Sequence, residues 1–281
     1  MRANYHTHSQ FCDGRSSAAE MAEAAHAAGY SILGFSSHAP LPFATGWTMK
    51  PEALPDYLAE TRRLKEAWTG RLEIAVGLEI DWIEGLVSPG DGRFDKADLD
   101  YRIGSVHYIK PGPGEAFTID SPAEEFDRNV TERAGGDGRL IYRTYYENLR
   151  RAIEAGGFDI LAHLDLVVRN NQQGRWFDEG SSDYLQAALA AVEPLSESGA
   201  VVEINLGAVL RGKAPAPHPS LPILRRLREL GVPITISADA HHVSHLGAGL
   251  DLARAHAAAA GYNEVAILSK GAWRLVGLDD I

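Results

Sequence analysis

The chain alternates short apolar or β-branched segments with longer segments of helical periodicity, and this alternation restricts its fold more than any other feature. We expect seven strands, at residues 3–6, 31–36, 73–80, 101–108, 159–163, 200–205 and 233–237. The main helices expected between them cover residues 16–28, 51–68, 140–155, 183–198 and 220–230. Strands that are separated by helices pair in parallel through right-handed crossovers. The pattern therefore predicts an α/β fold, either a closed barrel or an open doubly wound sheet.

The alternation runs through all 281 residues, and no linker rich in Pro, Gly and Ser divides it. We therefore expect a single domain over residues 1–281. Two segments rich in Gly, Pro and acidic residues, 88–98 and 110–138, follow the third and fourth expected strands. In an α/β barrel, long functional loops occur at these positions.

Composition limits the partners and the compartment. The chain has 27 basic and 38 acidic residues, a formal charge of −11, which argues against broad binding to nucleic acid or to an anionic membrane. Its single cysteine, Cys12, cannot form an intramolecular disulfide. No run approaches the roughly 18 to 20 apolar residues of a membrane span, and the N-terminus lacks the apolar stretch of a secretory signal. We therefore expect a cytoplasmic protein.

Histidines and carboxylates cluster where the expected strands end. Six of the seven strands deliver such residues at or just beyond their C-terminal ends: His6, His8, Asp13, His38, Glu79, His107, His163, Asp239 and His241. In a parallel barrel these ends form one face, so side chains from separate strands converge there. The pattern predicts a metal site on that face.

The spacing within two of these strands supports a shared site. His6 and His8 lie two residues apart, as do Asp239 and His241, and alternate residues of a strand face the same way. Imidazole and carboxylate ligands without thiolates favour Zn, Mn or Fe. A single histidine near a strand is most often a packed or surface residue, and we interpret most histidines outside this set in that way. Nine such residues together would bury several uncompensated charges unless metal were bound.

The segments around these residues resemble the polymerase and histidinol phosphatase (PHP) superfamily, in particular its monofunctional histidinol-phosphate phosphatases. The resemblance covers almost the full chain. It rests on His6-Thr7-His8 and on the segments at 11–14, 34–42, 77–81, 104–108, 162–166 and 237–241. His-Ala-Pro at 38–40 and Gly-Leu-Glu-Ile-Asp at 77–81 are similar to the phosphatase branch.

The resemblance implies a distorted seven-stranded (β/α) TIM-like barrel that holds two to three divalent ions at the C-terminal face of its strands. The first ion would be held by His6, His8, Glu79 and Asp239. Glu79 would bridge to a second ion held also by His107 and His163, and a third would lie between Asp13, His38 and His241.

The activity implied is hydrolysis of L-histidinol phosphate to L-histidinol and inorganic phosphate by a metal-bridging hydroxide. Glu79, Asp239 and His241 would carry the catalysis. The alternatives are a phosphoesterase of the same superfamily that acts on a nucleotide or another small phosphorylated metabolite, and a noncatalytic metal-binding or polymerase-accessory protein.

Four further residues are candidates for substrate contact. Arg169 and Arg211 follow the fifth and sixth strands, and guanidinium groups bind phosphate through paired hydrogen bonds. His242 and Asp165 are the candidate residues for the proton donor to the leaving group, with a metal-bound water as the alternative. The only partner we expect is a small phosphorylated substrate.

Overall fold

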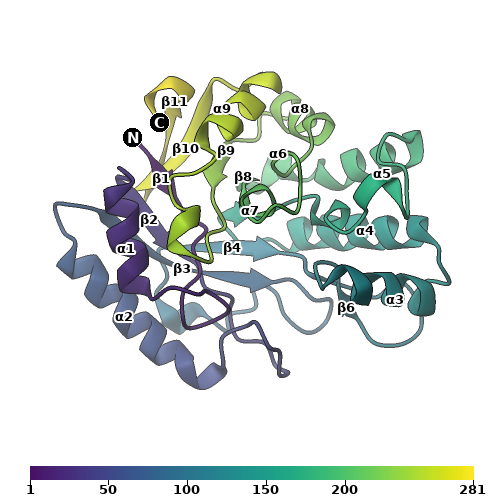
Figure 1. Ribbon diagram of the computed structural model, residues 1–281, viewed down its shortest axis with the longest axis horizontal. Helices are drawn as coiled ribbons and strands as arrows, with labels where there is room; N and C mark the ends of the chain where they lie inside the picture. Colours follow the sequence, from purple (N-terminus) through teal and green to yellow (C-terminus); the bar gives the residue numbers. More distant parts are fainter.

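The computed structural model describes residues 1–281 and is built round seven parallel strands (Figure 1). Their order is β1-β2-β3-β4-β7-β8-β9, so each strand lies beside its predecessor along the barrel. The strands are β1 (Ala3–Asn4), β2 (Ile32–Phe35), β3 (Glu73–Asp81), β4 (Tyr101–Ser105), β7 (Ile160–Leu161), β8 (Val201–Asn205) and β9 (Ile234–Ser237). All seven predicted strands are confirmed, although several are shorter than expected.

The first and last strands meet just beyond their C-terminal ends. Thr7 and Ala240 form a parallel bridge, in which the Ala240 amide donates to the His6 carbonyl at 3.0 Å and the His8 amide donates to the Ala240 carbonyl at 2.9 Å. The side chain of Asn4 accepts a hydrogen bond from the Ala238 amide at 2.6 Å. The seven strands therefore form a nearly closed TIM-like barrel, as predicted, and not an open sheet.

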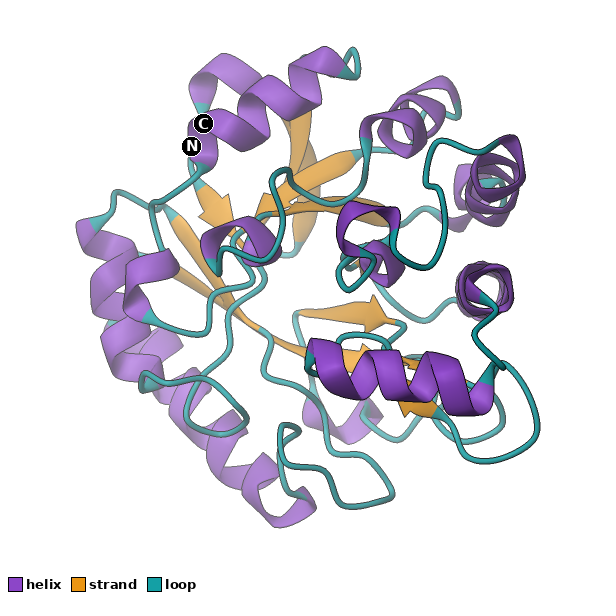
Figure 2. Cartoon of the chain, turned by 45° about the vertical axis from the view of Figure 1, so that its right-hand side comes forward, coloured by secondary structure: helices purple, strands orange, loops and turns teal.

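Helices surround the barrel (Figure 2). They are α1 (Ala18–Ala27), α2 (Leu54–Ala67), α4 (Gly138–Ala155), α5 (Ser182–Val192), α8 (Leu221–Glu229) and α9 (Leu250–Ala259). Helix α1 begins with a capping box, because Ser17 and Glu20 each accept a hydrogen bond from the other's backbone amide. Helices α4 and α5 pack against each other through buried tyrosines, and the hydroxyl oxygens of Tyr146 and Tyr184 are hydrogen-bonded at 2.7 Å.

Two predicted elements are divided in the structure. The expected strand at 101–108 ends at Ser105, which pairs with Asp81, the last residue of the neighbouring strand β3. The chain then forms a separate hairpin of β5 (Tyr108–Ile109) and β6 (Phe117–Thr118), followed by α3 (Ala123–Arg133). The expected helix at 183–198 breaks at Pro194, which has no amide hydrogen to continue it, and resumes as α6 (Leu195–Ser198).

A C-terminal hairpin was not predicted. Its strands β10 (Glu264–Ser269) and β11 (Ala272–Gly277) pair antiparallel. The buried Tyr5 hydroxyl donates to the Leu268 carbonyl and accepts from the Leu268 amide, both at 2.8 Å, so this side chain joins the hairpin to β1.

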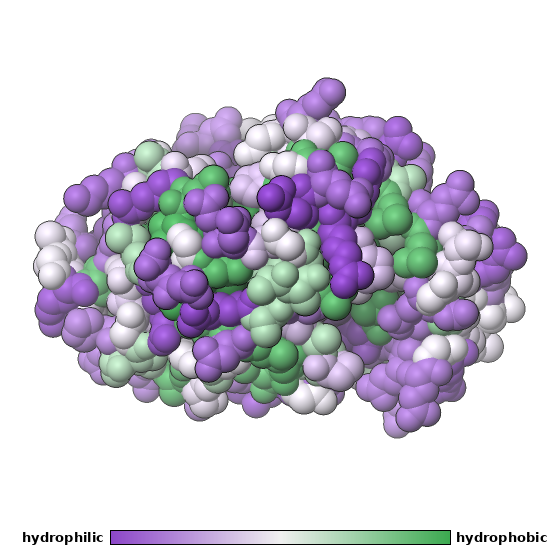
Figure 3. Space-filling model, turned by 90° about the horizontal axis from the view of Figure 1, so that it is seen from above, coloured by the Kyte–Doolittle hydropathy of each residue, from purple (hydrophilic) through white to green (hydrophobic).

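Hydrophilic residues cover most of the face shown in Figure 3, with smaller hydrophobic patches between them. None of the helices combines the length and the hydrophobicity that crossing a bilayer requires.

Tyr5→Phe should lower the free energy of unfolding by about 1–3 kcal/mol, because it leaves two buried backbone groups of Leu268 without partners. Chemical denaturation followed by circular dichroism measures this change. Leu275→Ala, at a side chain of the same hairpin that is 59% exposed, is the control and should change stability by less than about 0.5 kcal/mol. Equal stability of Tyr5→Phe and the wild type would contradict the role of the hydroxyl group.

Candidate metal centre

A cavity of about 1300 Å³ opens where the parallel strands end. Seven of the nine predicted metal ligands line it: Asp13, His38, Glu79, His107, His163, Asp239 and His241. The other two, His6 and His8, are fully buried beneath it. The structure therefore brings all nine residues to one place, although they come from segments up to 235 positions apart, as the numbers of His6 and His241 show.

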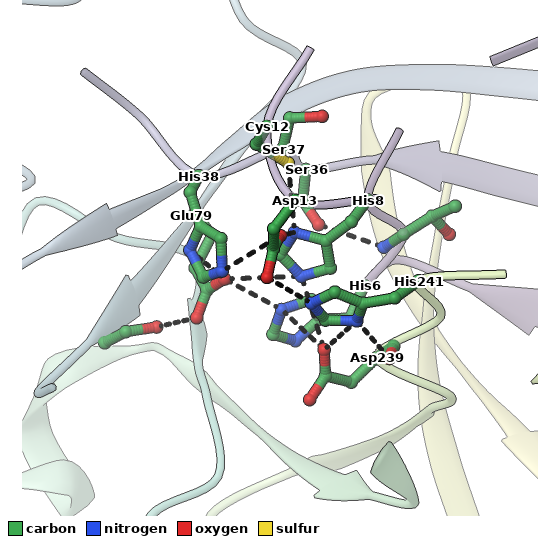
Figure 4. Close-up of polar contacts among 12 residues, drawn as sticks. His6, His8, Cys12, Asp13, Ser36, Ser37, His38, Glu79, Asp239 and His241 are labelled. Atoms are coloured by element: carbon green, nitrogen blue, oxygen red, sulfur yellow. Dashed lines mark hydrogen bonds and ion pairs between the residues drawn. The ribbon is translucent and has the colours of Figure 1, made fainter. Parts of the chain in front are cut away.

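Glu79 meets five histidines of this cluster and is only 1% exposed, and Figure 4 shows it beside His38. One carboxylate oxygen, Oε2, lies 3.1 Å from His6 Nε2, 3.5 Å from His8 Nε2 and 2.9 Å from His38 Nδ1. The other, Oε1, lies 3.1 Å from His163 Nε2 and 3.5 Å from His107 Nε2. Each oxygen thus faces a different set of imidazoles, the arrangement expected of a carboxylate between two ions.

Three overlapping groups of side chains have ligand atoms within 4.8 Å of one another. They are His6, His8 and Glu79; His38, Glu79 and His107; and His8, Asp13, His38 and His241. Asp239 extends the first group, with its Oδ1 3.3 Å from His8 Nε2 and 3.7 Å from His6 Nε2. These groups differ from the implied ligand sets in three ways: His38 lies beside Glu79 as well as Asp13, His8 belongs to two groups, and His163 belongs to none.

Several buried ligand atoms in the cluster make no hydrogen bond of good geometry, although they lie 2.9–3.5 Å from one another: His6 Nε2, His8 Nε2, His38 Nδ1 and Glu79 Oε2. Buried polar atoms without partners are costly, and native proteins contain few of them. Nitrogen and oxygen atoms that converge in this way are the ligands of first-row divalent ions. The residues present therefore fit a centre for divalent metal ions.

The electrostatics of the cluster differ from one side chain to the next. Burial acts to raise the pKa of Glu79, but the neighbouring His38 and His6 rings outweigh it and hold that pKa well below its usual range. Burial disfavours the charged form of His107, but the Asp81 and Glu79 carboxylates raise its pKa to about 10. Burial and the nearby His241 and His38 rings lower the pKa of His8 to about 3. The carboxylates thus attract either protons or metal cations to this point.

Unusual backbone conformations place two of the predicted ligands. His163 and Asp239 both have positive φ angles, 20° and 47°, which residues other than glycine rarely adopt. Gly207, after β8, allows the close approach to Asp239, because a Cβ atom there would lie 2.4 Å from Asp239 Oδ2. Strained residues of this kind concentrate at functional sites.

Arg211 and Arg169 both line the cavity, in different surroundings. Arg211 donates from Nη2 to Asp239 Oδ2 and from Nη1 to the Asp239 carbonyl, each at 3.0 Å. Arg169 pairs with Asp120 Oδ2 at 3.1 Å. Arg211 is therefore held against a predicted metal ligand, whereas Arg169 lies on the wall formed by the loop before α3.

The structure places His242 and Asp165 differently. His242 lines the cavity, and its Nδ1 accepts a hydrogen bond from the Ser244 amide at 3.2 Å. Asp165 is 1% exposed and does not line the cavity, contrary to its predicted contact with substrate. Its two oxygens instead accept from His218 Nδ1 at 2.6 Å and from the Ser220 amide at 2.7 Å.

Two buried carboxylates near the cluster were not assigned a role from the sequence. Asp81 Oδ1 lies 2.8 Å from His107 Nδ1, and Glu203 lies within 3.1 Å of His6 Nδ1. Asp81 follows Glu79 at same-face spacing, a signal that was available in the sequence. Glu203 is the only charged residue of β8, and only the fold reveals its contact with His6.

Comparison with known proteins agrees with this geometry. The family model described as "PHP domain" matches residues 4–206. The chain belongs to the PHP family. A probable histidinol-phosphatase of Deinococcus radiodurans is 32% identical over 245 residues, which cover 86% of this chain and 87% of that protein. The histidinol-phosphatase of Bacillus subtilis is 24% identical, over 86% of this chain and 94% of its own.

A solved structure shows the same PHP fold. The histidinol phosphate phosphatase of Lactococcus lactis, determined with zinc, L-histidinol and phosphate, superposes with a TM-score of 0.66. The match covers 97% of this chain and 98% of that chain, at 20% sequence identity. At this identity the comparison establishes the architecture of the barrel.

Zinc should stabilise the folded protein, because the cluster exists only when the barrel is formed. At a free concentration about 100 times the dissociation constant, binding adds about 2.7 kcal/mol, which raises the unfolding midpoint by roughly 5–10 °C. Differential scanning calorimetry with zinc and then with excess chelator measures this shift. Glu79→Gln should reduce the shift, and an identical midpoint with zinc and with chelator would contradict the metal centre.

Proposed function

We propose that this protein is a metal-dependent phosphatase that hydrolyses L-histidinol phosphate to L-histidinol and inorganic phosphate. The observation that carries the proposal is a cluster of buried, unpartnered ligand atoms on the floor of a cavity whose walls carry arginines. The names of the relatives from Deinococcus radiodurans and Bacillus subtilis support the choice of substrate.

The proposed cofactors are two to three divalent ions, with Zn, Mn and Fe as the candidate metals. His6, His8, Glu79 and Asp239 would hold the first, and Glu79, His107 and His163 the second. Asp13, His38 and His241 would hold the third. Such ions, when bound, lower the pKa of water towards 7 and neutralise charge on phosphoryl oxygens.

The arginines of the cavity are proposed to bind the phosphate group. Arg169 is 19% exposed at its side chain and Arg211 22%, so each is partly desolvated while still open to the cavity. Charge-assisted hydrogen bonds from such groups to phosphate are stronger than those between neutral partners. Arg211 also neutralises Asp239, so it is proposed to act on both the metal centre and the substrate.

His242 is proposed to donate the proton to the leaving alkoxide. Because its Nδ1 accepts from the Ser244 amide, the neutral ring carries its proton on Nε2. Asp165, the other candidate, is excluded from this role by its burial and by its two hydrogen-bond donors.

The rest of the cavity fits an organic cation with an aromatic ring. The rings of Trp47 and Tyr108 stack, with centroids 6.2 Å apart and an angle of 24° between their planes. Phe43 packs edge-on against Tyr108, with ring centroids 5.6 Å apart. Asp120, Glu125 and Glu132 line the same cavity. Aromatic faces and carboxylates together suit the imidazole and the ammonium group of histidinol.

The test of the proposed substrate is phosphate release from L-histidinol phosphate, a nucleoside monophosphate and a sugar phosphate by metal-loaded protein. We expect kcat/KM for L-histidinol phosphate to exceed the others by about 100-fold, or about 2.7 kcal/mol of transition-state discrimination. Folded Glu79→Gln is the control and should release no phosphate. An equally large preference for the nucleotide would replace the proposed substrate with the alternative one.

The two arginines should give different kinetic results. Arg169→Ala removes a charged hydrogen bond worth about 1.5–3 kcal/mol, so KM should rise roughly tenfold to a hundredfold while metal content is retained. Arg211→Ala also removes the partner of Asp239 Oδ2, so kcat should fall as KM rises while metal content is retained. Steady-state kinetics and elemental analysis of both variants check this, and wild-type KM in Arg169→Ala would remove that residue from the phosphate site.

A further inference from the structure

Glu203 lies on β8, the one barrel strand from which no metal ligand is predicted. Its side chain is completely buried, at 0% exposure, below the cavity that the proposed reaction uses. An isolated carboxylate in such a place would be very costly, so its partners determine what it does.

All the polar contacts of Glu203 are donors directed at its two oxygens. His6 Nδ1 lies 3.1 Å from Oε1 and 3.0 Å from Oε2. The backbone amide of His163 donates to Oε1 at 3.0 Å, and Asn205 Nδ2 donates to the same oxygen at 2.7 Å. Asn205 is itself held in this orientation, because its side-chain oxygen accepts from the Gly207 amide at 2.8 Å.

The contact with His6 fixes which ring nitrogen carries the proton. A carboxylate without a proton can only accept, so Nδ1 of the His6 ring must donate. In the neutral ring Nε2 is then free of its proton, and this atom lies 3.1 Å from Glu79 Oε2. A carboxylate that orients a histidine through its other nitrogen is a recurrent feature of metal sites.

The contact with His163 fixes a strained stretch of backbone. His163 has a φ angle of 20°, in a sparsely populated region, and its side chain meets Glu79 Oε1 at 3.1 Å. The hydrogen bond from its amide to Glu203 helps to hold that conformation. One carboxylate therefore supports two histidines that approach Glu79 from β1 and from the end of β7.

We propose that Glu203 is a positioning residue shared by two of the metal positions, through the ring of His6 and the backbone of His163. This inference rests on the metal centre of the proposed function. Asp81 provides the comparison within the same chain, because its carboxylate meets a single predicted ligand, His107 Nδ1, at 2.8 Å. Loss of the Glu203 carboxylate should thus weaken the binding of two metal ions, and loss of the Asp81 carboxylate the binding of only one.

Glu203→Ala is the main variant, because it removes the acceptor of both the His6 ring and the His163 amide. Asp81→Ala is the comparison variant, because it removes the acceptor of the His107 ring. Glu203→Gln keeps one acceptor oxygen, and if that oxygen serves His163 and Asn205, only the contact with His6 Nδ1 is lost. Thr235→Val, at the buried position paired with Glu203 on β9, is the control for changing a buried polar side chain.

The measurement is zinc affinity and stoichiometry by competition with a chromophoric chelator, together with circular dichroism of each variant. We expect two zinc ions to bind about 10- to 100-fold more weakly in Glu203→Ala, and one in Asp81→Ala and in Glu203→Gln. Thr235→Val should keep the wild-type affinities. Folded Glu203→Ala with wild-type affinities, or with no greater loss than Asp81→Ala, would overturn the proposal. Absence of zinc binding by the wild type would instead contradict the metal centre itself.

A second measurement covers the case in which Glu203→Ala does not fold. Nitrogen-15 NMR of the zinc-loaded wild type should show His6 protonated at Nδ1, and Glu203→Asp, which keeps an acceptor, should retain that proton and bind zinc more tightly than Glu203→Gln. A wild-type His6 ring without a proton at Nδ1 would overturn the role of Glu203, whatever the behaviour of the glutamine variant.

Discussion

The burial of Glu79 among imidazoles is the interaction on which the rest of the structure depends. This carboxylate is nearly inaccessible to solvent, and rings from β1, β2, β4 and β7 or the residues that follow them all approach it: His6, His8, His38, His107 and His163. Burying so many ionisable groups without compensation would cost several kcal/mol for each unpaired charge. The barrel can keep this arrangement because cations bound at the same point would satisfy the free lone pairs.

The closure of the barrel and the metal centre use the same residues. His6 and His8 flank Thr7, which forms the bridge to Ala240, and Ala240 lies between Asp239 and His241. The backbone of these segments joins the first strand to the last, while the alternate side chains turn inwards. Glu203 adds a link across the barrel, because it binds the ring of His6 and the backbone of His163. The geometry of the site is therefore a consequence of how the barrel closes.

The sequence predicted the barrel well because its signals are local and repeated. Each parallel strand is a short apolar run, and the positions just beyond the strand ends could be identified without knowing the fold. The C-terminal hairpin was missed, although Lys270-Gly271 between the apolar segments of β10 and β11 is a turn signal. Strand β4 was predicted too long, because its end at Ser105 coincides with the end of its neighbour β3 at Asp81, which the local pattern does not show.

Within the site, the sequence predicted which side chains would lie close together, but it did not predict which groups the buried carboxylates would contact. Nine residues were selected by their same-face spacing and their position at strand ends, and all nine lie in one cluster. Their roles as metal ligands remain a prediction. Asp165 was predicted to contact substrate because it lies just beyond the fifth expected strand. In the structure it is buried and binds His218, which lies 53 positions away in the sequence. Glu203 and His6 are 197 positions apart, and no local pattern connects them.

The most direct test of the metal centre is an anomalous difference map from crystals grown with zinc and measured on both sides of the zinc absorption edge. We predict peaks beside Glu79, about 2.0–2.2 Å from His6 Nε2 and from the ring nitrogens of His107 or His163. A map with zinc only at surface sites, and with no peak in contact with Glu79, would contradict the account.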